Sequence, residues 1–227
     1  MRALLLALPL VLLSGCIYMS RHTPAGACQE ALNSPVRNFC VVDSGVLWRG
    51  EGPTVADTEW LLDNGMQSVL SIQLDPRRAF EHAKVRPNLV RSVTYFQVEG
   101  ANPFQILSRP RLDRLVALFI AVVDMAPKPL YVHCRAGVDR AGILVASYQI
   151  LAGRISREEA VEQMARFHTP WLPVERRYLL GLTEERQQQI LRDVDNWKAR
   201  LKPLGHFDCE QGRCRYVANP GGTVARP

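Results

Sequence analysis

Two residues near the middle of the chain, Cys134 and Arg140, have the types and the spacing needed for chemistry on an anionic ester. They lie in the run LYVHCRAGVDRAG, which covers residues 130–142. The apolar stretch at 129–133 predicts a short strand that leads directly into Cys134, and the apolar run at 141–151 predicts a central helix. A strand, a short loop and a helix are therefore expected in that order, with the cysteine and the arginine at the two ends of the loop.

The loop between these two elements has the features of an anion-binding site. Where a loop enters a helix N-terminus, successive backbone N–H groups can point inward, and the helix dipole adds to their attraction for an anion. The same field favours the thiolate form of Cys134, and Gly137 lets the backbone turn without a Cβ in the way. Arg140 can hold two phosphate oxygens in a planar fork. The residues expected to bind phosphate are Arg135, Ala136, Gly137, Val138, Asp139 and Arg140.

The elements that must position this loop follow from hydrophobic patterning. Strands are expected near 41–48 and at 67–74, 93–98 and 129–133. Helices are expected over 54–65, 111–125, 141–151, 156–168 and 175–197. Thr54 can cap the first helix, and Ser156 with Glu159 forms a capping box that opens the fourth. Strands that alternate with helices indicate an α/β domain with a largely parallel sheet.

His133 and Cys134, followed by five residues and Arg140, resemble the signature of the protein tyrosine phosphatase superfamily, in its compact dual-specificity-like bacterial branch. The run VLWRGEGP at 46–53, the helix to Gly65 and the strand at 68–72 look like the N-terminal half of that branch, so the similarity covers residues 39–168. The resemblance implies a cysteine-phosphatase fold, which is a single α/β domain with a central, mostly parallel sheet of about four to five strands flanked by helices.

The resemblance also implies a reaction. In the family the cysteine attacks phosphorus to form a phosphocysteine, water hydrolyses that intermediate, and neither a metal nor another cofactor is required. It implies that Cys134 is the nucleophile, that Arg140 holds the phosphate and that His133 orders the loop by hydrogen bonding. Basic loop residues such as Arg135 are typical of members that act on phosphoinositides or other multiply charged esters.

The general acid is open between two carboxyl groups. The family places an aspartate on a loop well upstream of the cysteine, but Glu99 is the only carboxylate between Val98 and Pro110. A carboxyl group on such a loop can reach the ester oxygen. Asp139, inside the Cys134–Arg140 run, resembles the loop aspartate of bacterial and lipid-directed relatives in which that residue is proposed to act as the acid. Both Asp139 and Glu99 are therefore candidate catalytic residues.

Ala141 departs from the family pattern, which has Ser or Thr directly after the arginine to help the thiolate leave when phosphocysteine breaks down. The leading function is a phosphatase acting on phosphotyrosine or phosphoserine/threonine, on phosphoinositide-like lipids or on small phosphate monoesters. The alternative is a phosphate-binding pseudophosphatase with little turnover. A rhodanese-like sulfur transferase also places a cysteine in an anion loop, but Arg140 and Gly137 favour phosphate.

The first fifteen residues are typical of a secretory signal, because Arg2 precedes an apolar run from Ala3 to Leu13. The segment ends in Leu13-Ser14-Gly15-Cys16, which looks like a bacterial lipobox. Lipidated Cys16 would anchor the protein to a membrane. We therefore expect a periplasm-facing protein of the bacterial cell envelope, in the outer rather than the inner membrane because Ile17 follows the cysteine.

The rest of the chain divides into a tether at 16–38, the phosphatase-like domain at 39–204 and an irregular tail at 205–227. Export favours disulfides, so Cys28, Cys40, Cys209 and Cys214 predict two bridges in one of three pairings and leave Cys134 free. The formal net charge of +6 is consistent with anionic partners but does not indicate which one. The expected partners are a phosphorylated protein, lipid or small molecule and the membrane, with no nucleic acid, and the protein is expected to be a monomer.

Overall fold

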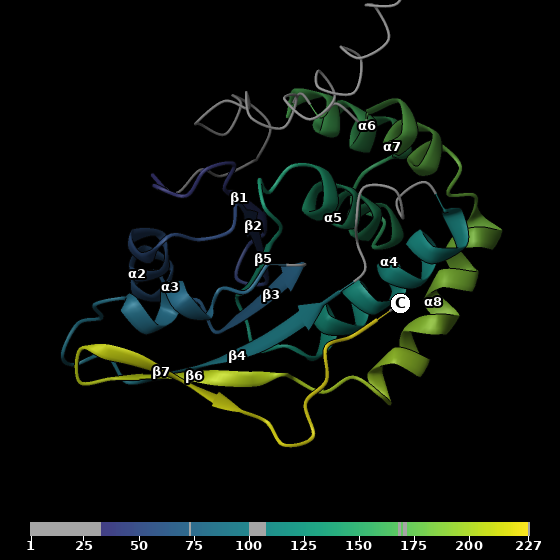
Figure 1. The fold of residues 1–227 in the computed structure, drawn as a ribbon. Helices are drawn as coiled ribbons and strands as arrows, with labels where there is room; N and C mark the ends of the chain where they lie inside the picture. The colour runs from purple at the N-terminus through teal and green to yellow at the C-terminus, as the bar shows by residue number, and fades with distance from the viewer. Residues whose placement is uncertain (1–32, 73, 100–107, 168, 170–171, 227) are drawn as a thin grey trace, which may run out of the picture.

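The fold is a mixed sheet with helices on both faces, seen in a computed structural model that describes residues 33–72, 74–99, 108–167, 169 and 172–226 (Figure 1). The strands are β1 (Cys40–Asp43), β2 (Leu47–Gly50), β3 (Ser68–Ile72), β4 (Arg91–Val98), β5 (Leu130–His133), β6 (Gly205–Glu210) and β7 (Arg213–Ala218). The helices are α2 (Val55–Asp63), α3 (Arg77–His82), α4 (Arg109–Met125), α5 (Asp139–Leu151), α6 (Arg157–Arg166), α7 (Leu172–Leu180) and α8 (Glu184–Lys198).

The sheet confirms the predicted α/β class and has more strands than predicted. Its seven strands follow the order β1-β2-β5-β3-β4-β6-β7, rather than the four to five expected. The inner strands β2, β5, β3 and β4 are parallel, whereas β1, β6 and β7 extend the sheet in antiparallel fashion at its two edges. Gly50 and Ser71 lie in register with His133, so three parallel strands end together where Cys134 begins.

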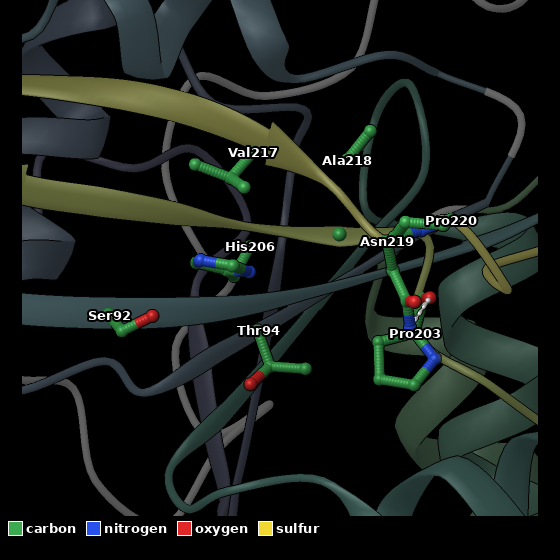
Figure 2. Close-up of a pocket in the computed structure, with 9 residues that line it drawn as sticks. Ser92, Thr94, Pro203, His206, Val217, Ala218, Asn219 and Pro220 are labelled. Atoms are coloured by element: carbon green, nitrogen blue, oxygen red, sulfur yellow. Dashed lines mark hydrogen bonds between the residues drawn. The ribbon is translucent and has the colours of Figure 1, made fainter.

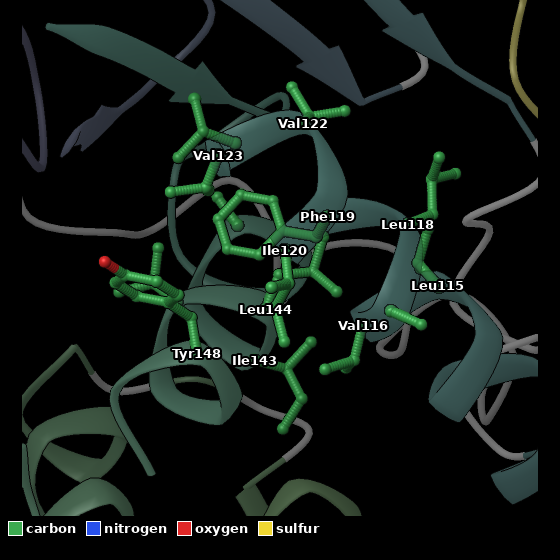
Figure 3. Close-up of a cluster of buried hydrophobic side chains, with 14 of the residues drawn as sticks. Leu115, Val116, Leu118, Phe119, Ile120, Val122, Val123, Ile143, Leu144 and Tyr148 are labelled. Carbon is green, nitrogen blue, oxygen red and sulfur yellow. The ribbon is translucent and has the colours of Figure 1, made fainter. Parts of the chain in front are cut away.

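Strands β2, β3 and β5 are buried on both faces, as is typical of parallel strands covered by helices, whereas β4 alternates and exposes Ser92. Successive side chains of a strand point to opposite faces, and Val69 accordingly packs with α2 and α3 while Leu70 packs with α4 and α5. Figure 3 shows the larger cluster, in which Phe119 and Ile120 of α4 face Leu144 of α5. The core thus fixes β5 and α5, the two elements that flank the Cys134–Arg140 run.

Local signals account for several helix boundaries. Thr54 caps α2 and Ser156 caps α6, and both form complete capping boxes. The polar helix expected at 175–197 is instead two helices, α7 and α8, separated at Gly181. Thr183 caps α8 by accepting a hydrogen bond from the Arg186 N–H, so a new helix start replaces the expected continuation.

The tail from residue 205 onward was expected to be irregular, and this prediction is wrong. It forms the hairpin of β6 and β7, and β6 pairs with β4. The turn is possible because Gln211 and Gly212 both adopt positive φ angles, of 50° and 84°, as two-residue hairpin turns require. A disulfide joins Cys209 to Cys214, which lie opposite each other in the hairpin.

The end of the expected tether is also part of the domain. Within 33–38, Val36 and Asn38 are each only 3% exposed, so the domain begins before Phe39. The predicted signal peptide, Cys16, Cys28 and the rest of the tether lie outside the described residues. Cys40 is disulfide-bonded. In the part of the chain that the structure describes, no helix is both long and apolar enough to cross a membrane.

Candidate active site

Cys134 lies at the carboxyl end of β5, and the loop that follows it runs directly into the N-terminus of α5 at Asp139. It is the free cysteine of the described residues and is 2% exposed. The backbone N–H of Gly137 donates a hydrogen bond of 3.2 Å to its Sγ. Gly137 makes this possible by adopting a φ of 71°, which only glycine adopts without cost. The predicted strand, loop and helix are confirmed.

The carbonyl oxygens of this 134–140 loop are bound from its outer side. Gly52 N–H donates to Arg135 O over 3.3 Å, and Asn38 Nδ2 donates to Ala136 O over 2.9 Å. Arg49 Nη2 donates to Gly137 O over 2.8 Å and lies 3.5 Å from Val138 O. In a planar trans peptide the C=O and the N–H point in opposite directions. Binding of the Ala136 carbonyl by Asn38 therefore agrees with the direction of the Gly137 N–H, which donates to the Cys134 sulfur.

Two side chains of β5, those of Tyr131 and His133, make contacts next to the loop. Tyr131 Oη donates a hydrogen bond of 2.5 Å to Glu51 O. Tyr131 also stacks on His133, with 5.8 Å between ring centroids. Burial lowers the pKa of His133 to about 4, so the ring is neutral near pH 7. Its Nδ1 lies 3.4 Å from Cys134 O. The predicted ordering of the loop by His133 would act through this contact.

Asp139 begins α5 and is linked to the segment between α6 and α7. Thr169 Oγ1 donates a hydrogen bond of 2.5 Å to Asp139 Oδ1. Burial raises the pKa of Asp139, while the hydrogen bond from Thr169 and the charges of Arg140 and Arg49 act in the opposite direction. A carboxyl group whose pKa is raised keeps its proton to higher pH, as a general acid must.

The remaining predicted residues take different places. Arg140 is the second residue of α5 and is half-buried, while Arg135 is exposed at the start of the loop. Glu99 lies just past β4, which is separated from β5 by β3. Its Oε2 lies 3.0 Å from Arg226 Nη2. Cys134, Asp139 and Arg140 therefore lie between the end of β5 and the first turn of α5. Glu99 instead lies at the end of β4, where it pairs with Arg226.

The structure adds four residues that the motif did not indicate: Asn38, Arg49, Thr169 and Glu175. Arg49 is 4% exposed and Glu175 is fully buried, beside Asp139. Burial raises the pKa of Glu175 to about 8, and the Asp139 charge adds to this shift. The one available sequence signal was Arg49 itself, a charged residue inside a short apolar strand, because such residues are seldom buried without a partner.

A separate pocket lies on the face of β4, β6 and β7 (Figure 2). Its lining includes Thr94, His206 and Asn219 and none of the residues 134–140. The hydrogen-bonded loop, and not this pocket, carries the reactive groups. Among the described residues, no group of three or more His, Cys, Asp or Glu side chains is arranged to hold a metal ion.

Comparison with protein families agrees with this geometry. Residues 38–171 match the family described as PTP-NADK, a DSP-PTPase phosphatase fused to NAD+ kinase. The chain belongs to this DSP-PTPase family. The match begins at Asn38 and so includes the donor to Ala136 as well as the whole loop.

Two curated proteins are similar to this member of the family over part of their length. Inositol diphosphatase DSP1 of Oryza sativa subsp. japonica is 29% identical over 117 residues, which are 51% of this chain and 50% of that protein. NAD kinase 2, chloroplastic, of Arabidopsis thaliana is 24% identical over 120 residues, which are 51% of this chain and 12% of that protein. The chain thus spans half or less of the length of these relatives.

Solved structures show the same fold. The P. aeruginosa protein TpbA, crystallised in complex with pTyr, has a TM-score of 0.52 at 18% identity, covering 76% of this chain and 98% of that one. The core catalytic domain of the PP-IP phosphatase SIW14 from S. cerevisiae has a TM-score of 0.50 at 18% identity, covering 71% of this chain and 94% of that one. The predicted cysteine-phosphatase fold is confirmed.

Proposed function

We propose that this protein is a cysteine-dependent phosphatase that hydrolyses phosphate monoesters through a phosphocysteine at Cys134. The observation that carries the proposal is a free thiol, Cys134, that accepts a hydrogen bond from the Gly137 N–H in a loop whose carbonyls at Arg135, Ala136 and Gly137 are bound by other donors. Such a loop stabilises the charge on the equatorial oxygens of a transferring phosphoryl group. Membership of the DSP-PTPase family supports the same activity.

The reaction has two steps. In the first, the Cys134 thiolate attacks phosphorus, the bond to the leaving oxygen breaks, and a general acid protonates that oxygen. In the second, water attacks phosphorus and the S–P bond breaks, which restores the thiolate and releases inorganic phosphate. The carboxylate left by the first step takes the proton of the water and becomes the acid again. Arg140 binds two non-bridging oxygens during both steps, while the N-terminus of α5 contributes its dipole.

Asp139 is the better supported of the two candidate acids. It precedes Arg140 directly, is the first residue of α5 after the loop and has a pKa that burial raises. Glu99 lies beyond a strand that does not adjoin β5, and Arg226 binds its carboxylate. We assign the proton donation to Asp139 and keep Glu99→Gln as the comparison in its test.

The proposed substrates are phosphorylated proteins, phosphoinositide-like lipids and small phosphate esters. One structural neighbour was crystallised with pTyr, and one curated relative is named an inositol diphosphatase. Exposed Arg135 is the loop side chain placed to meet additional negative charge on a substrate. A panel of phosphotyrosine peptide, phosphoserine peptide, phosphoinositide and inositol diphosphate, compared in wild type and Arg135→Ala, ranks these classes by kcat/KM.

A phosphate-binding protein with little turnover is the second candidate, and one observation favours it. Ala141 is fully buried where the family has a hydroxyl residue. Without that hydroxyl the thiolate is a poorer leaving group, so phosphate would be captured and released slowly.

We also propose that the protein is exported and lipid-anchored through Cys16. The support is the signal and lipobox pattern of residues 2–16 together with the disulfides at Cys40 and at Cys209–Cys214, since disulfides persist in oxidising compartments. Mass spectrometry of the membrane fraction should find acyl chains on Cys16 and none in Cys16→Ser. A soluble wild-type protein without acyl groups would refute the anchor.

Hydrolysis of p-nitrophenyl phosphate tests the activity. Wild type should release p-nitrophenol, and Cys134→Ser and Arg140→Lys should each be slower by about 100-fold or more. The first change removes the thiolate nucleophile, and the second removes the planar fork that binds the phosphate oxygens in the transition state. Wild-type activity equal to that of Cys134→Ser would refute the enzyme proposal.

A further inference from the structure

Arg49 occupies an unusual position for an arginine. It lies in β2, next to β5 in the sheet, and is 4% exposed. Its guanidinium lies over the Phe167 ring, 4.2 Å from the centroid. A Cβ added to Gly142 of α5 would lie 3.3 Å from Arg49 Nη2, so glycine leaves the room that the side chain uses. The fold therefore encloses a cation directly behind the 134–140 loop.

The contacts of Arg49 are with the backbone of the loop. One nitrogen, Nη2, donates to Gly137 O over 2.8 Å and lies 3.5 Å from Val138 O. Gly137 is the residue whose N–H reaches the Cys134 sulfur, over 3.2 Å. Arg49 thus binds the carbonyl of the Gly137–Val138 peptide, while the N–H of the Ala136–Gly137 peptide donates to the Cys134 sulfur.

Three acidic groups lie around this buried cation. Burial lowers the pKa of Arg49 to about 10, and the charges of Cys134, Glu175 and Asp139 act against that shift. Asp139 and Glu175 also lie near each other, and Thr169 Oγ1 donates a hydrogen bond to Asp139 Oδ1. A buried charge is costly unless other groups stabilise it. The loop carbonyls and the Phe167 ring contact the guanidinium, which places a positive charge near Cys134.

We propose that Arg49 is a positioning residue for the phosphatase reaction: it holds the loop in its anion-binding form through Gly137 O and keeps its positive charge close to the Cys134 sulfur. This inference rests on the proposed function. Arg49 acts from behind the loop, so its part in catalysis passes through the loop backbone and the sulfur rather than through contact with the substrate. An arginine suits both tasks, because it stays charged when buried and its planar fork holds a fixed geometry.

The test uses Arg49→Met, Arg49→Lys and the control Arg91→Met. Arg91 is a fair control because it also donates to backbone carbonyls, those of Leu62 at 2.6 Å and Met66 at 3.4 Å. It lies at the opposite end of the parallel strands, in register with Cys209. The measurements on the full chain are the pH dependence of Cys134 alkylation by iodoacetamide, the Kd for inorganic phosphate and kcat and KM for p-nitrophenyl phosphate.

We expect Arg49→Met to move the alkylation midpoint up by about one pH unit and to weaken phosphate binding by about tenfold, which equals about 1.4 kcal/mol. Arg49→Lys keeps the charge and should restore the midpoint, but not the phosphate affinity, because an ammonium on a flexible stem does not reproduce the fork. Arg91→Met should leave both values unchanged even where it lowers Tm.

The outcomes separate the two proposals. An Arg49→Met protein that matches Arg91→Met in midpoint and phosphate affinity overturns the positioning role, whether or not wild type hydrolyses esters. If wild type shows no turnover but Arg49→Met shows the expected shifts, the proposed function is refuted. The role of Arg49 in holding the anion-binding loop is then retained. Where Arg49→Met does not fold, Arg49→Lys decides, since unchanged phosphate affinity in that variant overturns the inference.

Discussion

The backbone of Gly137 packs directly against the backbone of Gly50. A Cβ built on Gly137 would lie 2.2 Å from the Gly50 carbonyl carbon and 2.4 Å from its oxygen. Gly50 ends β2, and Gly137 is the turn of the 134–140 loop. The end of one parallel strand therefore forms the wall against which the loop closes, and Gly137 cannot gain a side chain without moving that wall. A Cβ on Gly50 would instead lie 2.5 Å from Tyr131 Oη.

Gly137→Ala should lower kcat/KM for p-nitrophenyl phosphate by about 100-fold, because displacing a catalytic loop by about 1 Å costs that much. The matched control is Gly153→Ala. Gly153 has a similar φ of 66°, but a Cβ there meets nothing within 4 Å. The control should lose about 1 kcal/mol of unfolding free energy from the left-handed backbone and keep its activity. Equal activities in the two variants would show that the contact with Gly50 does not matter.

Asp139→Asn should remove the alkaline limb of the kcat/KM pH profile and lower the maximum by about 100-fold or more, because an amide cannot donate the proton. Burial raises the pKa of Asp139, so the wild-type limb should fall at a pH above that of an ordinary aspartate. Glu99→Gln loses only the pair with Arg226 and should keep both limbs. Loss of the limb in Glu99→Gln alone would reverse the assignment.

Glu175→Gln should flatten the pH dependence of stability. In the folded state burial raises the pKa of Glu175 from 4.5 to about 8. Between these values the unfolded chain releases a proton that the folded chain keeps, so unfolding free energy falls as pH rises, by a total on the order of a few kcal/mol. Urea titrations from pH 5 to pH 9 should show this fall in wild type and in the exposed control Glu210→Gln. If the unfolding free energy depends on pH in the same way in wild type, Glu175→Gln and Glu210→Gln, this account of Glu175 is contradicted.

Ala141→Ser should speed the second step of the reaction. If phosphocysteine breakdown limits wild type, p-nitrophenol appears in a burst followed by a slow steady state, and a hydroxyl next to Arg140 should shrink the burst and raise the steady rate severalfold. Ala146→Ser is the control, since Ala146 is a buried alanine of the same helix. Identical bursts in all three proteins would show that Ala141 does not limit turnover.

The sequence was most informative where the structure depends on neighbouring residues. The apolar runs predicted β5 and α5 around Cys134, and the serine–glutamate pair at Ser156 and Glu159 predicted the start of α6. Each of these signals acts within a few residues, through strand alternation, a buried helix face or a cap. Cys134 and Arg140, the proposed nucleophile and phosphate-binding residue, are in the same short run, so their motif can be read from the sequence without knowledge of the fold.

What the sequence did not predict depends on long-range pairing. Asn38 reaches Ala136 across 98 positions and Arg49 reaches Gly137 across 88, so no local pattern marks either contact. The β6–β7 hairpin was missed for the same reason, since β6 is stabilised by pairing with β4. Thr169 and Glu175 meet Asp139 only after α5, α6 and α7 pack together.

The most direct test of the central claim is to locate the covalent intermediate. Wild-type protein mixed with p-nitrophenyl phosphate is quenched in acid within the first turnover, digested and sequenced by tandem mass spectrometry. The account predicts one phosphate on the sulfur of Cys134, with none in Cys134→Ser and a larger trapped fraction in Asp139→Asn when a fast-leaving aryl phosphate is used. Sustained phosphate release by wild type with phosphate on another residue, or on none, would contradict it.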